Sequence, residues 1–479
     1  MTLTSKAVHA VKWNAAGAVV RASIQYAQLA VLTRLLTPSD FGLMAVVSAI
    51  TAYGAIFAEA GMSSGLIQRA AADNVVRSTV FWASVLIACC SAGLLVATAP
   101  LLAHLFHSDH FRESILICAP SLVISAVGRQ FEVDAERALA FRGLVVIDAL
   151  SNGFGAVVAV TLAYREHGAV AIAWGILASS GARCMLNWIC IARAWTPRAC
   201  FNRRAAQPYV NFGSLVLAGN LVNQVNSSID VLLGGRLLGM NTAGLYSVPR
   251  QLILSVQGLV NPIVTRVGFP LIARSQHDGE QTSIVYRRMV NAIALTNAPI
   301  YSAIAVLHID ICALLLGPGW ADSAGLLIPL SAWGYLRSLQ NPVGALLLGL
   351  GRAKRALAWN CALLVFYPVA LVIGSKFGVI GLASSLLVTA LILLVPGWRW
   401  LVQPFTGWEL RGYLATTILP LLIAIGCCLA AKILTQQMAN VPLRIGMTLL
   451  VAGMGYLLAV PFISPVAGQL ARSCIHFRR

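Results

Sequence analysis

The sequence has very little charge for its length. Only 10% of its 479 residues are Asp, Glu, Lys or Arg, whereas soluble proteins carry about 25%. So few charges cannot cover a water-facing surface, which argues against soluble enzymes and soluble nucleic-acid-binding proteins. The hydrophobic content of 58% also excludes a disordered chain. The composition therefore predicts a polytopic membrane protein.

Motifs for nucleotide chemistry, hydrolysis and metal binding are missing as well. The sequence contains no G-x-x-x-x-G-K-[ST] phosphate loop, no H-E-x-x-H pair and no nucleophile–base constellation. His104, His107 and His110 lie close together beside Asp109, but their position favours a solvated loop over a metal site. We therefore expect neither an enzyme nor a cofactor or metal.

Long apolar runs are abundant. A helix needs about 20 apolar residues to cross a bilayer. The runs are continuous rather than alternating, which predicts helices and not barrel strands. We expect fourteen spans, near residues 11–33, 41–60, 79–101, 114–131, 144–163, 168–191, 209–233, 244–266, 289–309, 324–348, 357–374, 378–398, 412–433 and 444–464.

The basic residues indicate how these spans are oriented. With the N-terminus placed in the cytoplasm, 23 of the 34 Lys and Arg fall on the cytoplasmic side, seven on the opposite side and four inside spans. Cytoplasmic loops carry such an excess, so both termini are expected in the cytoplasm. The net charge of +18 is then a signal of topology and lipid contact rather than of nucleic-acid binding.

The sequence repeats itself at an offset of 202 residues. RLLTPSDFGLMAV at 34–46 aligns with RLLGMNTAGLYSV at 236–248, with six identities in thirteen positions. Six spans separate the copies, so the halves share one orientation, as in transporters with a site between two halves. We predict an all-helical protein with two pseudo-symmetric six-helix lobes, in residues 1–208 and 209–400, and two extra helices in residues 401–479.

One face of the first span is polar. Asn14, Arg21, Gln25 and Gln28 fall within about 60° of one another on a helix. Because a charge inside a bilayer is costly, this face predicts either a hydrophilic cavity or hydrogen bonds that hold the helices together. The repeat offset places a second polar face on the seventh span, at Asn223, Ser227 and Asp230, and Asn220 lies near the same face.

A second cluster of polar residues lies within the span near 324–348. Arg337 is followed by Gln340, Asn341 and a proline, and broken polar helices of this kind bind substrates in transporters. Trp333 and Tyr335 beside them suit either stacking on sugar rings or an aromatic packing cluster.

The remaining charges inside spans are two arginines and three acids. Arg183 and Arg250 either line a cavity or extend toward the membrane surface. Glu59, Asp148 and Asp230 either couple the movement of an ion or form structural ion pairs with the arginines.

Three motifs carry a family resemblance: RLLTPSDFG at 34–42, GMSSGLIQR at 61–69 and Phe81-Trp82. Here the chain resembles the bacterial polysaccharide-biosynthesis flippases. These form the polysaccharide transporter family of the multidrug/oligosaccharidyl-lipid/polysaccharide exporter superfamily, and the colanic-acid and exopolysaccharide exporters are the most similar type. The resemblance implies two six-helix lobes with two further helices.

The resemblance also implies a function in the bacterial inner membrane. Members carry undecaprenyl-pyrophosphate-linked oligosaccharide repeat units from the cytoplasmic to the periplasmic leaflet for exopolysaccharide, O-antigen or capsule assembly. The implied partners are that lipid, the bilayer, a polysaccharide polymerase and a co-polymerase. Alternatives of the same fold are a drug or cation antiporter and a peptidoglycan lipid-precursor flippase.

The cargo of such a flippase suggests roles for the polar residues. Guanidinium groups suit a pyrophosphate, which assigns the head group to Arg21, Arg337, Arg250 and Arg183. Amides and hydroxyls suit the glycan, which assigns it to Asn14, Gln25, Gln28, Asn220, Asn223, Ser227, Gln340 and Asn341. Rocking of the two lobes then gives alternating access.

Overall fold

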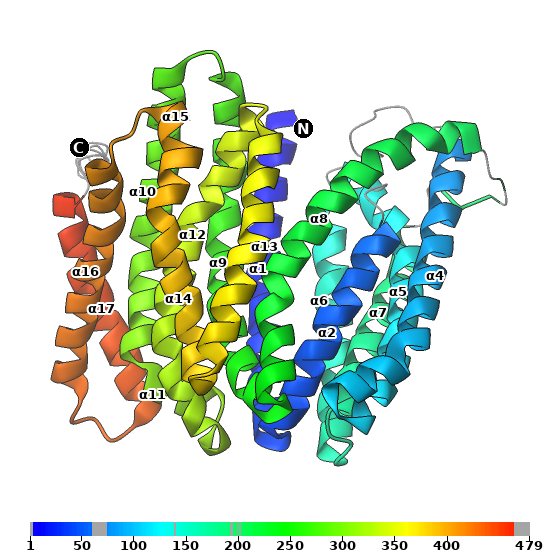
Figure 1. Ribbon diagram of the computed structural model, residues 1–479, viewed down its shortest axis with the longest axis horizontal. Helices are drawn as coiled ribbons and strands as arrows, with labels where there is room; N and C mark the ends of the chain where they lie inside the picture. Colours follow the sequence, from blue (N-terminus) through cyan, green and yellow to red (C-terminus); the bar gives the residue numbers. More distant parts are fainter. Residues whose placement is uncertain are drawn as a thin grey trace. The chain divides into compact units, whose positions relative to one another are not determined.

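The structure is a computed structural model that describes residues 3–59, 74–137, 140–191, 195–198, 200 and 203–463. Within these ranges every regular element is a helix. The described residues form two compact units, one within Met1–Gly244 and one within Leu245–Arg479. The helices of each unit run alongside one another (Figure 1).

Seven long helices make up most of the first unit, and an eighth begins in it. They are α1 (Leu3–Leu35), α2 (Pro38–Glu59), α4 (Asn74–Phe106), α5 (Asp109–Arg137), α6 (Phe141–Tyr164), α7 (Val170–Cys190), α8 (Arg203–Leu238) and α9 (Met240–Arg274). Most of α9 belongs to the second unit, where Pro249, Pro262 and Pro270 lie within the helix.

The second unit contains six more long helices and several short ones. The long helices are α10 (Gly279–Val306), α12 (Leu327–Gly349), α13 (Ala353–Ser375), α14 (Gly378–Gly397), α16 (Leu410–Thr435) and α17 (Val441–Ile463). The short elements are α11 (His308–Leu315), the 3₁₀ helix η2 (Pro318–Leu326), the π-helix η3 (Trp398–Val402) and α15 (Gln403–Thr406).

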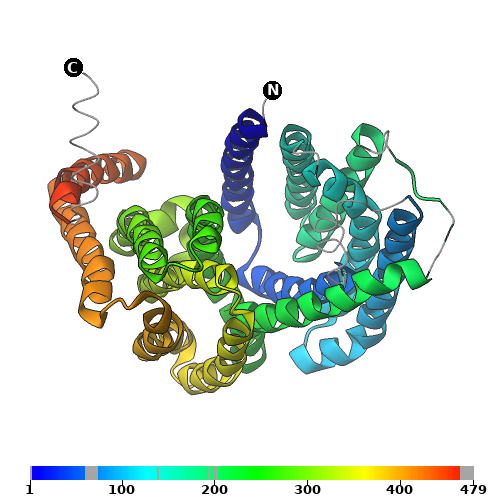
Figure 2. The ribbon, with the colours of Figure 1, turned by 90° about the horizontal axis from the view of Figure 1, so that it is seen from above.

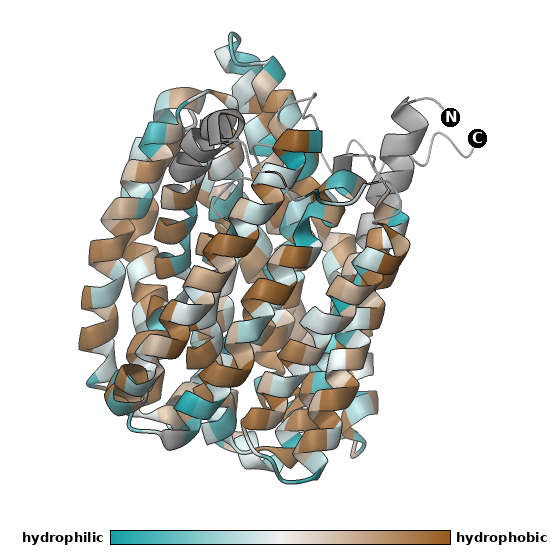
Figure 3. Cartoon of the chain, turned by 90° about the vertical axis from the view of Figure 1, so that its right-hand side faces the viewer, coloured by the Kyte–Doolittle hydropathy of each residue, from teal (hydrophilic) through white to brown (hydrophobic). Residues whose placement is uncertain are grey.

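The predicted fold class is confirmed, because each of the fourteen apolar runs corresponds to one long helix of the described chain. Ten described helical segments are long and apolar enough to cross a membrane by length and composition. The other four long helices, α1, α7, α8 and α12, contain Arg21, Arg183, Asp230 and Arg337. Figure 3 shows apolar colouring along the helices and hydrophilic colouring in many of the connecting segments.

Several helices continue past the ends that hydropathy predicts. The run near 114–131 is part of α5, which extends to Arg137, and the run near 209–233 is part of α8, which begins at Arg203. Hydropathy falls at the first charges, whereas backbone hydrogen bonding continues through them. Glu132, which lies just past the predicted span near 114–131, is therefore on the same helix as Arg129.

The TPSD segment begins α2 with a local hydrogen-bonded cap. Pro38 is the first residue of the helix, where its missing N–H costs nothing. The Thr37 hydroxyl and backbone N–H both donate to Asp40 Oδ2, at 2.7 and 3.0 Å, and Asp40 N–H donates to Thr37 Oγ1 at 3.3 Å. Asp40 Oδ1 also accepts the N–H of Ala169 at 2.9 Å, which joins the α1–α2 and α6–α7 connections.

The helices α4, α5, α6 and α7 form a group that is seen in cross-section in Figure 2. Helix α1 packs on α6, and α8 packs on α2 and α4. Alanines fill the contact of α1 with α6 and α7, where Ala159, Ala163 and Ala171 lie against Leu32 and Leu36. Such small residues allow membrane helices to approach closely.

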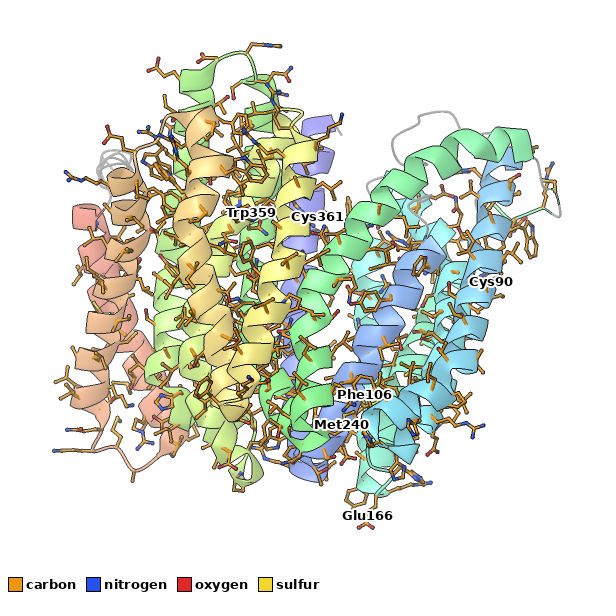
Figure 4. All side chains as sticks on the ribbon, in the orientation of Figure 1. Cys90, Phe106, Glu166, Met240, Trp359 and Cys361 are labelled. Atoms are coloured by element: carbon orange, nitrogen blue, oxygen red, sulfur yellow. The ribbon has the colours of Figure 1, made fainter. Side chains whose placement is uncertain are left out.

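The start of α2 and the start of α9 cross at their backbones. A Cβ atom on Gly42 would lie 1.8 Å from the carbonyl oxygen of Met240, and one on Gly244 would lie 1.6 Å from that of Pro38. Gly42 and Gly244 are equivalent positions of the 202-residue repeat, so the repeat preserves the two residues that meet at this crossing. Met240 lies at the same end of these helices as Phe106 and Glu166 (Figure 4).

Candidate functional site

A network of ion pairs connects five helices of the first unit, and it begins at Arg21 on α1. Arg21 Nη1 donates to Asp148 Oδ2 on α6 at 2.7 Å. The other oxygen of Asp148 accepts from Arg183 Nη1 on α7 at 3.0 Å. Asn152, one turn along α6, donates to the same oxygen at 3.2 Å. Asp148 therefore holds two of the predicted arginines together.

Glu132 on α5 is the next member of the network. It accepts from Arg183 Nε at 2.6 Å and Nη2 at 3.3 Å, which is a two-bond contact with one guanidinium. Asn187 Nδ2 and Arg129 Nη1 each donate to it at 2.9 Å. This carboxylate, which the sequence analysis did not select, makes more contacts within the network than any residue that it did select.

Arg129 closes the network at α2. Its guanidinium lies 3.3 Å from Glu59 Oε1 and 3.2 Å from Glu136 Oε1, in addition to its bond with Glu132. Glu59 and Asp148 were each predicted either to couple an ion or to form an ion pair. Both of them form ion pairs in this structure.

The acids and arginines of the network differ in exposure. The side chains of Arg21 and Arg183 are 51% and 44% exposed, whereas those of Asp148 and Glu132 are 8% and 7% exposed. The carboxylates thus lie beneath the guanidinium groups and orient them. An anionic ligand approaching from the open side meets cationic groups first, and this arrangement suits a phosphate.

Two cavities adjoin the network inside the first unit. The larger measures about 480 Å³ and is lined by residues of α2, α4, α5, α7 and α8. The smaller measures about 240 Å³ and is lined by Glu132, Arg183 and Asn187 among others. Glu59, Ser125 and Arg129 line both cavities. Charged residues of the network therefore line both cavities, which lie next to each other within one unit.

The predicted polar faces of the first and seventh spans are present on α1 and α8. Gln25 is exposed and Gln28 is half-buried. Asn14 lies on α1, but its side chain is outside the described part of the structure. On α8, Asn220 and Asn223 are exposed, Ser227 is half-buried and Asp230 is buried.

One residue of α8 links its polar face to α2. The hydroxyls of Ser228 on α8 and Tyr53 on α2 are hydrogen-bonded at 2.8 Å. Asp230, two residues further along, accepts the N–H of Val231 at 3.0 Å. These contacts belong to the packing of α8 against α2, so this end of the polar face of α8 lies inside the unit.

In the second unit, Arg337 lies over the ring of Trp333, with the guanidinium carbon 5.3 Å from the ring centroid. Trp333 and Tyr335 are both 1% exposed, and the Tyr335 hydroxyl donates to Thr417 O on α16 at 2.6 Å. Sugar stacking is the wrong interpretation of these two rings, because burial against neighbouring helices leaves them no open face.

The other predicted residues of the second unit differ in accessibility. Gln340 is half-buried and Asn341 is exposed on α12. Arg250 is 7% exposed on α9, so its side chain lies within the unit and does not extend to the membrane surface.

Sequence reasoning missed Arg129, Gln130 and Glu132 because it placed this part of α5 at or beyond the end of a span. A signal was available in the spacing. Arg129, Glu132 and Glu136 lie three and four residues apart, which places them on one face of a helix. A charged face on the continuation of an apolar helix indicates contact with another polar helix.

The histidines of the α4–α5 connection do not form a metal site with other described residues. The rings of His104 and His107 have centroids 6.2 Å apart, and His110 Nδ1 lies 3.8 Å from Glu113 Oε2. In the described ranges no three His, Cys, Asp or Glu side chains are grouped closely enough to hold a metal ion.

Comparison with known proteins connects this architecture to polysaccharide assembly. The chain is 26% identical over 425 residues to the teichuronic acid biosynthesis protein TuaB of Bacillus subtilis (strain 168), covering 88% of this chain and 87% of that protein. It is 25% identical over 429 residues to the lipopolysaccharide biosynthesis protein WzxC of Escherichia coli (strain K12), covering 89% of this chain and 87% of that protein.

The fold is similar to that of the lipid II flippase MurJ in an inward closed conformation. The TM-score is 0.75 at 13% sequence identity, and the match covers 95% of this chain and 98% of that chain. The sequence model of the family described as "Polysaccharide biosynthesis protein" matches residues 31–325. At 13% identity the likeness to MurJ shows the fold, and the family description names polysaccharide biosynthesis. Because the family match covers more than half of the chain, this protein belongs to the polysaccharide biosynthesis protein family.

Proposed function

We propose that the protein is a flippase for undecaprenyl-pyrophosphate-linked oligosaccharide repeat units, which it moves from the cytoplasmic to the periplasmic leaflet of the bacterial inner membrane. Membership of a polysaccharide biosynthesis family supports a glycan cargo. The many apolar helices support a route through the bilayer. The positive charge bias supports cytoplasmic placement of both termini.

The observation that carries the proposal is the layering of charge around Arg21. Asp148 engages Nη1 of Arg21 from below, which leaves the Nε–Nη2 edge of the guanidinium for an anion. That edge is planar and donates two parallel hydrogen bonds, which matches two phosphate oxygens. A cationic drug would be repelled at the same place.

Arg183 has a different role in this proposal. Its Nε and Nη2 bond to Glu132 and its Nη1 bonds to Asp148, so its donors hold the two buried carboxylates in place. We infer that Arg183 is a positioning residue that keeps Asp148 beneath Arg21. Its charge still adds to the positive potential that attracts a pyrophosphate.

The remaining steps follow from the chemistry of the cargo. The isoprenoid tail stays in lipid, while the glycan needs hydroxyl and amide partners such as Gln25, Asn220 and Asn223 along its route. Arg250 and Arg337 remain candidates for a second pyrophosphate contact. Rocking of residues 1–208 against residues 209–400 gives each leaflet access in turn.

Replacement of Arg21 by Ala tests the assignment in cells. We expect Arg21→Ala to abolish polymer export, because the pyrophosphate loses its two-bond partner, while the protein level in the membrane stays normal. Arg21→Lys keeps the charge without the planar edge and should restore only part of the export. The measurement is surface polymer per cell, with immunoblotting of the membrane fraction.

Arg112→Ala is the matched control, because Arg112 is exposed in the first turn of α5 and lies outside the network. It should export as well as the parent. Normal polymer output from Arg21→Ala at a normal protein level contradicts the proposed role of Arg21.

A further inference from the structure

The larger of the two cavities that adjoin the ion-pair network has the size and lining of a saccharide site. Its volume is about 480 Å³, within the range of about 300–1,000 Å³ that is common for small-ligand sites. We propose that this cavity binds sugar residues of the cargo inside a single unit, at a place separate from the pyrophosphate contact at Arg21. The inference rests on the proposed function, because it names where the glycan of that cargo is held.

A buried polar side chain in the cavity wall, Gln130 on α5, indicates that the cavity holds a polar ligand. Its side chain lines the cavity and is 95% removed from solvent, being 5% exposed. Among the described residues its amide Nε2 has no hydrogen-bond partner. Burial of an amide without a hydrogen-bond partner is unfavourable, so a polar ligand that hydrogen-bonds to the Gln130 side chain stabilises the site.

Hydroxyl groups elsewhere in the lining complement this amide. Thr51 Oγ1 donates to Val47 O at 2.8 Å, and Ser121 Oγ donates to Cys118 O at 2.6 Å. With their hydrogens committed to the helix backbone, both oxygens present lone pairs to the cavity. The lining therefore offers an amide donor and hydroxyl acceptors, which is the pairing that sugar hydroxyls satisfy.

The rest of the lining suits the apolar faces of a sugar ring. Phe81 on α4 and several alanines lie between the polar groups. At one end, the single cation Arg129 is already 3.3 Å from the single anion Glu59. The cavity thus offers no excess of charge, so a neutral polyhydroxylated group fits it better than a pyrophosphate or a cationic drug.

The network connects this cavity with the proposed pyrophosphate contact. Arg129 lines the cavity and bonds to Glu132, which bonds to Arg183, which bonds to Asp148 beneath Arg21. Sugar and pyrophosphate would then lie against two ends of one chain of ion pairs. This gives the protein separate contacts for the variable part and the constant part of its cargo.

Binding of two lipids to the purified full-length protein separates these contacts. The first probe is the lipid-linked oligosaccharide extracted from cells that lack this chain, and the second is undecaprenyl pyrophosphate without glycan. We expect the parent protein to bind the glycan-bearing lipid at least ten times more tightly. Gln130→Leu and the cavity-filling Ser125→Phe should reduce this ratio to near one while binding of the bare lipid is unchanged.

Two controls make each outcome informative. Gln281→Leu removes an exposed amide at the start of α10 and should keep the full ratio. Arg21→Ala should weaken the binding of both lipids by the same factor. The inference is overturned if the parent binds both lipids alike, or if Gln130→Leu and Ser125→Phe both keep the preference. If the parent binds neither lipid, the proposed function itself fails.

Discussion

At the scale of single residues, Glu132 is the centre of the charged network. It accepts hydrogen bonds from Arg183, Asn187 and Arg129 while only 7% of its side chain is exposed. Burial of a carboxylate is tolerated only when its hydrogen-bond donors are all present, so the contacts of Glu132 depend on one another. Its removal leaves two guanidinium groups without their shared partner.

Neutralisation of Glu132 should therefore destabilise the protein. Breaking a buried ion pair costs about 3–5 kcal/mol, so we expect Glu132→Gln to lower the Tm of the detergent-solubilised protein by several degrees. Glu136→Gln makes the same chemical change one turn along α5, where the side chain is 31% exposed and pairs with the same Arg129. That variant should change stability by less than about 1 kcal/mol. Equal losses of Tm in the two variants contradict the central role of Glu132.

At the scale of helices, the crossing of α2 and α9 depends on two glycines. Gly42 and Gly244 allow carbonyl oxygens to approach where any Cβ atom would overlap them. Glycine inside a helix is unfavourable by about 0.5–1 kcal/mol relative to alanine. The retention of glycine in both copies of the repeat is explained by this contact.

Substitution at the crossing tests that explanation. Gly42→Ala places a methyl group 1.8 Å from Met240 O, so the helices must separate, and overpacking of this kind costs about 1–3 kcal/mol. We expect a clear drop in Tm. Gly93→Ala on α4 meets no atom within 4 Å and should be neutral or slightly stabilising. The explanation fails if Gly42→Ala is as stable as Gly93→Ala.

The sequence predicted the helices better than their ends and contacts. Apolar runs identified all fourteen long helices of the described chain because membrane spans must be apolar. The extension of α5 to Arg137 was missed, and Glu132 with it. Hydropathy marks where the apolar part of a helix ends, but it does not show where the helix itself ends. Asp148 was selected by its position in a span, but its bonds to Arg21 and Arg183 depend on packing between helices.

At the scale of the whole molecule, residues predicted on the same side of the membrane contact one another within the first unit. Asp40, in the first turn of α2, accepts the N–H of Ala169 in the α6–α7 connection, and both residues are predicted on the outward side. Segments predicted on the cytoplasmic side also meet, since Arg77 pairs with Asp134 and Ser78 accepts the N–H of Arg198 at 3.0 Å.

Thiol labelling in spheroplasts tests which side each loop faces. In a variant whose 11 cysteines are replaced, Glu166→Cys should react with an impermeant reagent added outside, since Glu166 is exposed in the α6–α7 loop (Figure 4). His277→Cys, between α9 and α10, should react only after the membrane is permeabilised. The opposite pattern contradicts cytoplasmic termini.

The central claim is that the protein moves a pyrophosphate-linked glycan across a bilayer through contact with Arg21. The most direct measurement reconstitutes the purified protein in liposomes that carry labelled undecaprenyl-linked oligosaccharide in the inner leaflet, and follows its appearance outside. The account predicts translocation by the parent and by Arg112→Ala, and none above protein-free liposomes by Arg21→Ala. Equal translocation by the parent and Arg21→Ala, or none by the parent, contradicts it.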